Sequence, residues 1–245
     1  MIQMLFKTLK DTDWETLSDF VSPVFFEVVP TFGMAGVFTK IIKDYTDNGE
    51  FKRVREQVRN RISSKLNIDI LERSGNNPDF NLTDENEKKA FGEKVLEIYF
   101  SQIFFSDVCI LDLRKSAFQS PSSWRPNSIY YRWSPEFLNG IKNMYRGFYE
   151  DDNTAFRLGL KALDLLHAEE IFRNQFGAGR QEAVVFKLSE FKKSFHSIFL
   201  SCKTNRTKLH PDFFALGVYL ICLYENLENL DTPFNVRESF FKGIN

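Results

Sequence analysis

Apolar residues recur every three or four positions along most of the chain, as they do on one face of a helix. The segment 50–66 shows the pattern clearly, and its apolar stripe comprises Phe51, Val54, Val58, Ile62 and Leu66. The chain holds 27 phenylalanines and only eight tyrosines, so most of its aromatic side chains lack a polar group and serve packing by default. No alternating run of β-branched residues competes. The sequence therefore predicts an all-α fold, an irregular bundle of about seven to nine helices.

Capping signals indicate where several helices begin. Thr12 with Glu15, and Asp84 with Glu87, have the spacing of a capping box. A further helix is expected at about 32–45. These features predict helices that begin near 12 and 84.

The stretch "SPEF" is a second type of start signal. It offers Ser134 as N-cap and Pro135 at the first helical position, and "EDDN" ends the predicted helix. The next helix is expected to begin at Asn153 and to run to "GAG" at 177–179. Two more follow, one from about 184 to 202 and a last one that opens at "HPDF" and ends near Leu230.

Five glycines lie inside these predicted helices: Gly92, Gly140, Gly147, Gly159 and Gly217. Each costs about 1 kcal/mol relative to alanine. Close helix crossings are the simplest compensation, because a glycine lets two backbones approach each other.

The polar stretch 67–87, with Gly75 and Pro78, is the best candidate for a domain boundary. It separates an N-terminal helical region, 1–70, from a main helical bundle, 84–245. At 245 residues, 43% of them hydrophobic, the chain can bury one large core. We expect the two regions to pack as a single globular unit.

Charge and cysteine content narrow the function classes. The formal net charge is −1, so no overall basic excess favours nucleic acid. The three cysteines, Cys109, Cys202 and Cys222, are odd in number, which favours a reduced, cytoplasmic setting. Of two apolar stretches, 20–42 contains Glu27 and two prolines, and 213–224 has the length of a buried core helix; neither is expected to span a membrane.

The stretch "CILDLRKSAFQSPSSWRPNSIYYRWSPEF" at 109–137 is the least helix-like long segment, and we expect a loop over 109–134. Its planar side chains are candidates for a ligand or partner site: Arg114, Trp124, Arg125, Tyr131, Arg132 and Trp133. The preferred interpretation is a structural plug in which Arg114 pairs with Asp112 or Asp107 and the indoles fill a gap between helices. A binding platform and a lid over a pocket remain alternatives.

The segment 50–66 carries the largest local charge excess. Beside its apolar stripe lie six basic residues against Glu50 and Glu56. Lys52, Arg55 and Arg59 are the candidates for contact with an anionic surface. A solvated face paired with acidic residues elsewhere is the plainer alternative.

Motifs for catalysis and cofactor binding are missing from the sequence. It lacks a Walker-type loop, a G-x-G-x-x-G, an H-E-x-x-H and paired C-x-x-C units. Asp164, His167 and Glu170 follow at i, i+3 and i+6, but a second ligand-bearing helix is missing, so we expect His167 to be hydrogen-bonded in the core. Cys202 with His196 has only proximity in sequence to support it as a nucleophile pair. We therefore predict no catalytic residues, no metal and no cofactor.

The order of elements from about 93 to 240 resembles the helical C-terminal lobe of the AarF/UbiB family of atypical kinase-like proteins. The similarity lies in "KVLEIYFSQIFF", in "SPEFLNGIKNMYRGFYEDDNTAFRLGLKALDLL" and in "LHPDFFALGVYLICLYENLENLDTPFNV". Where the family has its catalytic loop this chain reads "CILDLRKSAFQ", and where Asp-Phe-Gly is expected it reads "YRW". The resemblance thus implies a helical remnant that binds without phosphoryl transfer.

These observations predict a non-enzymatic, cytoplasmic interaction protein that contacts a protein partner or an anionic membrane surface, with peripheral membrane association and homo-oligomerisation as further options. The alternative is a small-molecule binding protein or enzyme whose arginine-lined pocket is closed by 109–134, a degenerate, catalytically inactive kinase-like protein included.

Overall fold

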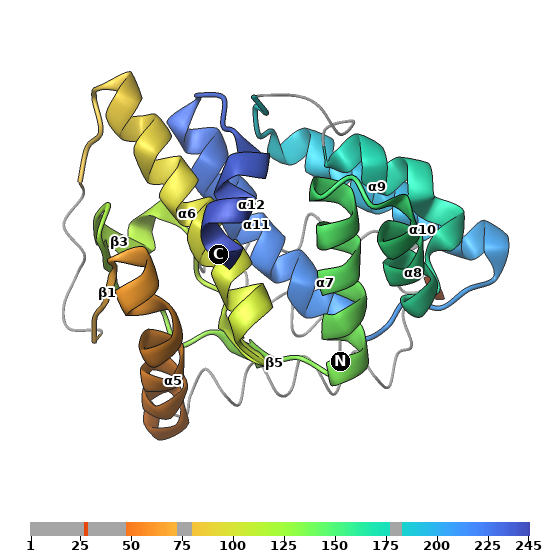
Figure 1. Cartoon of the computed structure of the whole chain (residues 1–245), viewed down its shortest axis with the longest axis horizontal. Coiled ribbons are helices and arrows are strands. Elements are labelled where there is room, and N and C mark those ends of the chain that lie inside the picture. The colour runs from red at the N-terminus through yellow and green to blue at the C-terminus, as the bar shows by residue number, and fades with distance from the viewer. Residues whose placement is uncertain (1–26, 29–47, 73–79, 177–182) are drawn as a thin grey trace.

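The computed structural model describes residues 27–28, 48–72, 80–176 and 183–245 (Figure 1). These residues form eight α-helices, which confirms the predicted all-α class. The helices are α5 (Asn48–Leu66), α6 (Glu85–Phe105), α7 (Pro135–Tyr149), α8 (Asn153–Ala162), α9 (Glu169–Gln175), α10 (Leu188–Asn205), α11 (Asp212–Leu230) and α12 (Val236–Ile244). The expected helices near 12 and at 32–45, the "GAG" stop and most of the apolar stretch 20–42 lie outside the described residues.

Two helices form the centre of the bundle. The apolar positions of α6 and α11 are buried around most of each helix, which is typical of a helix covered on several sides. Figure 1 shows α12 lying against α6, with α11 beside it. The segment 213–224 is thus buried within the bundle, as its length indicated. Over the described ranges, every helix is too short or too polar to pass through a bilayer.

The predicted start signals hold, with one change in their chemistry. Asp84 caps α6, since its carboxylate accepts from the backbone N–H groups of Asn86 and Glu87. Ser134 is the N-cap residue of α7, but its side chain makes no capping bond within that helix. It donates instead to Asp212, at 2.8 Å, and its backbone N–H donates to the same carboxylate oxygen at 2.9 Å. Asp212 of α11 therefore adds its negative charge to that of Glu136 at the start of α7.

Two glycines explain how α7 and α8 pack so closely. A Cβ on Gly147 would lie 2.1 Å from the backbone nitrogen of Phe156, and a Cβ on Gly159 would lie 2.5 Å from the backbone nitrogen of Met144. No side chain larger than a hydrogen fits either place without moving a backbone. The expectation that close helix crossings compensate for interior glycines is confirmed at this pair.

Three helix predictions need correction. The expected helix from Asn153 to "GAG" is broken after α8, where Asp164 adopts a left-handed conformation with φ 57°. A short 3₁₀ turn, η2 (Leu166–Ala168), then leads into α9. Val184 is extended and pairs with Phe234, so α10 begins only at Leu188. The helix α12 was missed, although Asn235 and Glu238 have capping spacing and Asn235 accepts from the Glu238 N–H.

The segment 109–134 was predicted to be a loop, but the structure shows short strands within it. They are β2 (Val108–Ile110), β3 (Phe118–Ser120), β4 (Ser123–Trp124) and β5 (Tyr130–Arg132), with a 3₁₀ turn η1 (Lys115–Ala117) between the first two. The strand β2 pairs antiparallel with β5, and β4 lies between β3 and β1 (Asp69–Ile70), which it meets in parallel. Such short strands supply hydrogen bonds to buried backbone N–H and C=O groups. They are too short to produce an alternating apolar and polar pattern in the sequence.

Candidate functional site

Both tryptophans of the 109–134 segment belong to the core. Trp124 is 0% exposed, lies stacked on Phe118, and donates through its indole N–H to the backbone oxygen of Asp112 at 2.9 Å. Trp133 is buried as well, and its indole N–H points at the sulfur of Cys109, 3.0 Å away. With their polar atoms bonded inside the protein, these indoles fill space between elements and do not form an exposed stacking platform.

The three arginines of the segment lie in different surroundings. Arg114 is buried and donates from Nε to the carboxylate of Asp112 at 2.8 Å, while the backbone N–H of Asn127 donates to the other oxygen of that carboxylate. Arg125 is half-buried, and Arg132 is exposed and pairs with Asp107 at 2.5 Å. None of the three lines the cavity of about 50 Å³ that is described below.

Tyr131 takes part in the cap of α7. Its hydroxyl donates to Asp212 at 2.7 Å, and burial raises the pKa of this tyrosine. Ser134, His210 and Asp212 thus meet at one place, but without the order of a catalytic triad. The Ser134 hydroxyl donates to the carboxylate, and His210 Nδ1 accepts from the backbone N–H of Asp212. A triad requires the imidazole to lie between hydroxyl and carboxylate, so this cluster is a helix cap.

Of the remaining candidates for chemistry, His167 is half-buried and not in the core as expected, and His196 is exposed. His167 Nε2 lies 3.2 Å from the hydroxyl of Thr207, and burial lowers the pKa of its imidazole. Across the part of the chain that the structure describes, three or more His, Cys, Asp or Glu side chains do not gather in a metal-binding arrangement. All three cysteines are buried. Burial raises the pKa of Cys109 to about 12, and it also raises the pKa of Cys202.

Such thiols are expected to be unreactive in the folded protein, because the thiolate is the reactive form. With Ellman's reagent at pH 8, we expect no modification of Cys109, Cys202 or Cys222 in the native state and modification of all three after unfolding in guanidinium chloride. Rapid labelling of one thiol in the folded protein would contradict this assignment.

The basic residues of α5 divide into exposed and buried ones. Lys52 and Arg59 are exposed, as the surface prediction required. Arg55 is not: it is 4% exposed and pairs with Glu72. Its residue type placed it in the predicted set. However, it follows the buried Val54 directly, and its side chain points toward the end of strand β1. Arg55 is therefore removed from the candidate surface.

A second group of cations lies on another flank of α5 and on α7. We call it the cationic rim; its members are Arg61, Lys65, Lys142 and Arg146. Arg61 donates to the last carbonyl of α6 at Phe105, the ammonium of Lys65 lies 3.8 Å from the centre of the Phe105 ring, and Arg146 lies over Phe104. Burial lowers the pKa of Lys142, and repulsion from Arg146 and Arg61 lowers it further, against the attraction of Asp107, which raises it.

The cationic rim lacks ion pairs of its own, and the nearby carboxylate of Asp107, which attracts Arg61 and Lys142, pairs with Arg132 instead. None of its four side chains makes an ion pair with a residue that the structure describes, whereas Arg53 and Arg59 on the same helix α5 pair with Glu50 and Glu56. Sequence reasoning missed Lys142 and Arg146 because they belong to a different helix from the basic segment. Their i, i+4 spacing places them on one face of α7, but only the tertiary structure brings that face to α5.

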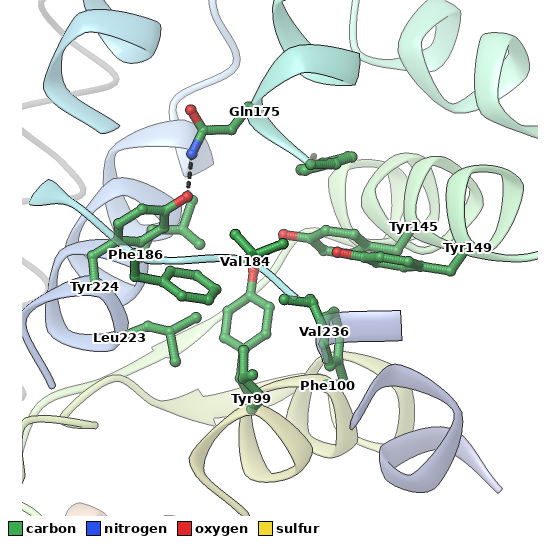
Figure 2. Close-up of a pocket in the computed structure, with 13 residues that line it drawn as sticks. Tyr99, Phe100, Tyr145, Tyr149, Gln175, Val184, Phe186, Leu223, Tyr224 and Val236 are labelled. Atoms are coloured by element: carbon green, nitrogen blue, oxygen red, sulfur yellow. Dashed lines mark hydrogen bonds between the residues drawn. The ribbon is translucent and has the colours of Figure 1, made fainter. Parts of the chain in front are cut away.

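A cavity of about 50 Å³ lies on the other side of α6, between α6, α7, α11 and α12 (Figure 2). The described residues that line it are seven aromatic ones, five aliphatic ones and Gln175. The hydroxyls of Tyr99 and Tyr145 are hydrogen-bonded to each other at 2.6 Å, and Gln175 donates to the hydroxyl of Tyr224. Burial raises the pKa of each of these three tyrosines. The helical stripes of the sequence contained Tyr99 and Tyr145 but gave no sign that they border a space.

No protein-family model matches this chain, and no curated protein matches it either. The resemblance to the AarF/UbiB helical lobe therefore stays a prediction.

Proposed function

We propose that this protein is a non-enzymatic helical interaction protein that binds an anionic membrane surface through α5 and the cationic rim. The observation that carries the proposal is the rim itself. Four cations from two helices meet there, and none of them forms an ion pair with a described residue, although Asp107, which pairs with Arg132, attracts Arg61 and Lys142. Like charges held together destabilise a fold unless something compensates, and an anionic surface supplies that compensation.

A lipid surface is preferred to an acidic protein because of Phe105. This side chain is 37% exposed, at the end of α6 and directly beside Lys65. A ring surrounded by cations suits a boundary between head groups and acyl chains. Lys52, Arg53 and Arg59 are also exposed on α5, away from the rim. Each Lys or Arg near an anionic leaflet contributes about 1 kcal/mol, so several together give measurable binding.

Vesicle flotation tests this proposal. The full chain is mixed with neutral phosphatidylcholine vesicles or with vesicles containing phosphatidylserine, at low and at high salt. We expect flotation only with the anionic vesicles and a marked loss at high salt, because screening shortens the range of the attraction. Absence of binding at low salt, or equal binding to neutral vesicles, would refute the proposal.

Charge reversal shows whether the rim is responsible. The double variant Lys142→Glu/Arg146→Glu is expected to weaken binding to anionic vesicles at least tenfold, at about 1 kcal/mol for each cation removed. The control is Lys187→Glu/Lys193→Glu, which changes the net charge equally at two exposed positions outside the rim. Equal loss in both variants would indicate a nonspecific charge effect and contradict a role for the rim. Binding of an acidic protein, without flotation of anionic vesicles, would favour the protein-partner alternative.

The AarF/UbiB resemblance agrees with a binding function. If the family relation holds, the missing catalytic motifs imply a pseudoenzyme. The small-molecule alternative is favoured by a different observation, the tyrosine-lined cavity.

A further inference from the structure

The cavity beside α6 has the composition of a binding site for a small uncharged molecule. Ligand sites are mostly apolar concavities with a few placed polar groups, and this one has twelve aromatic or aliphatic residues and one amide. None of the lining residues that the structure describes is charged. A charged ligand would therefore lose its hydration without gaining a partner of opposite sign, so the lining selects against ions.

One polar group of the lining is unused. Tyr149 is 5% exposed, and its hydroxyl makes no hydrogen bond with any residue that the structure describes. Figure 2 shows the hydroxyls of Tyr145 and Tyr149 directed side by side into the cavity, with Tyr99 below them. The Tyr99–Tyr145 pair also retains one proton to donate, since a hydroxyl that accepts a bond still holds its own. Two donors thus face the same space.

The Tyr149 hydroxyl keeps its proton at physiological pH. Burial holds the pKa of Tyr149 well above its usual value, and the neighbouring Tyr145 and Tyr224 add to the effect. At physiological pH the group is a neutral donor, so its complement is an acceptor on the ligand.

We propose that this cavity binds a small uncharged organic molecule by a carbonyl-type oxygen, with Tyr149 as the principal hydrogen-bond donor. Size limits how the ligand enters. The cavity measures about 50 Å³, whereas a cavity that encloses benzene measures about 150 Å³. A whole ring does not fit inside. The carbonyl and its nearest carbon atoms occupy the cavity, and the apolar remainder lies at its open side against the aromatic lining.

Water is the competing occupant, and it is distinguishable from a ligand. A site of about 50 Å³ has room for a few water molecules, which would satisfy Tyr149 without any selectivity. A ligand site instead discriminates between two molecules of the same shape, one with the acceptor and one without it.

The experiment uses acetophenone as the probe and isopropylbenzene as its match in shape without the oxygen. Binding of each to the full chain is measured by protein NMR titration. We expect saturable binding of acetophenone and weaker binding of isopropylbenzene. In Tyr149→Phe, the dissociation constant for acetophenone should rise about fivefold to tenfold, with that for isopropylbenzene unchanged. The control Tyr131→Phe removes a hydroxyl far from the lining and should leave both constants unchanged.

A blocking variant completes the test. Val184 borders the cavity (Figure 2), and Val184→Phe should abolish binding of acetophenone; Leu220→Phe serves the same purpose if the first variant fails to fold. No saturable binding to the wild-type chain would overturn the proposal, since it would leave the space to water. An unchanged acetophenone constant in Tyr149→Phe, or in a folded blocking variant, would overturn it as well.

Discussion

Replacing Asp112 with alanine is expected to lower the free energy of unfolding by about 3–5 kcal/mol. The carboxylate is 0% exposed and accepts from Arg114 and from the backbone N–H of Asn127. Its removal takes a neighbouring opposite charge away from a guanidinium group that is itself only 4% exposed. Urea denaturation should show a lower midpoint with an unchanged slope, because the loss lies in stability and not in the area exposed on unfolding.

The matched control for Asp112→Ala is Asp107→Ala. Asp107 also pairs with an arginine, Arg132, but both side chains of that pair are about half exposed. An exposed pair contributes at most about 1 kcal/mol, so this variant should stay within that limit. Similar losses at the two positions would mean that burial does not govern the strength of the Asp112 pair.

Replacing Gly147 with alanine is expected to destabilise the protein by about 3 kcal/mol, at the upper end of the usual range for overpacking. The added methyl would lie 2.1 Å from the backbone nitrogen of Phe156 and 2.5 Å from its Cα. A backbone cannot rotate away as a side chain can, so α7 and α8 would have to separate. Thermal or urea unfolding of the variant gives the loss directly.

Gly217 provides the contrasting case. A Cβ there would meet only the ring of Phe195, at 3.2 and 3.4 Å, and that half-buried ring can shift. Alanine also gains about 1 kcal/mol of helix propensity over glycine. We therefore expect Gly217→Ala to be about neutral or slightly stabilising. A loss as large as that of Gly147→Ala would show that contact with the backbone is not the deciding factor.

Local chemistry explains which helices were predictable. The α5 stripe is buried from Phe51 to Leu66, as its spacing indicated, and Asp84 and Pro135 marked the starts of α6 and α7. These features act within a few residues of chain. The break at Asp164 was not predictable from spacing, because the apolar pattern continues through it and only a single left-handed residue interrupts the helix.

The candidate sites were less predictable, since both combine distant segments. The cationic rim joins Arg61 of α5 with Lys142 of α7. The cavity joins Tyr99 of α6 with Tyr224 of α11. In each case the residue types were visible in the sequence, but the packing of helices decides which faces meet. The burial of Arg55 shows the same limit, because its charge alone suggested exposure.

The carboxylate of Asp212 links the beginnings of two helices. It lies in the first turn of α11 and accepts from Ser134 at the start of α7, 78 residues earlier in the chain. An isolated α7 lacks this acceptor, so we expect its first turn to gain stability when α11 docks. The stability of this helix end therefore depends on contact between distant parts of the chain.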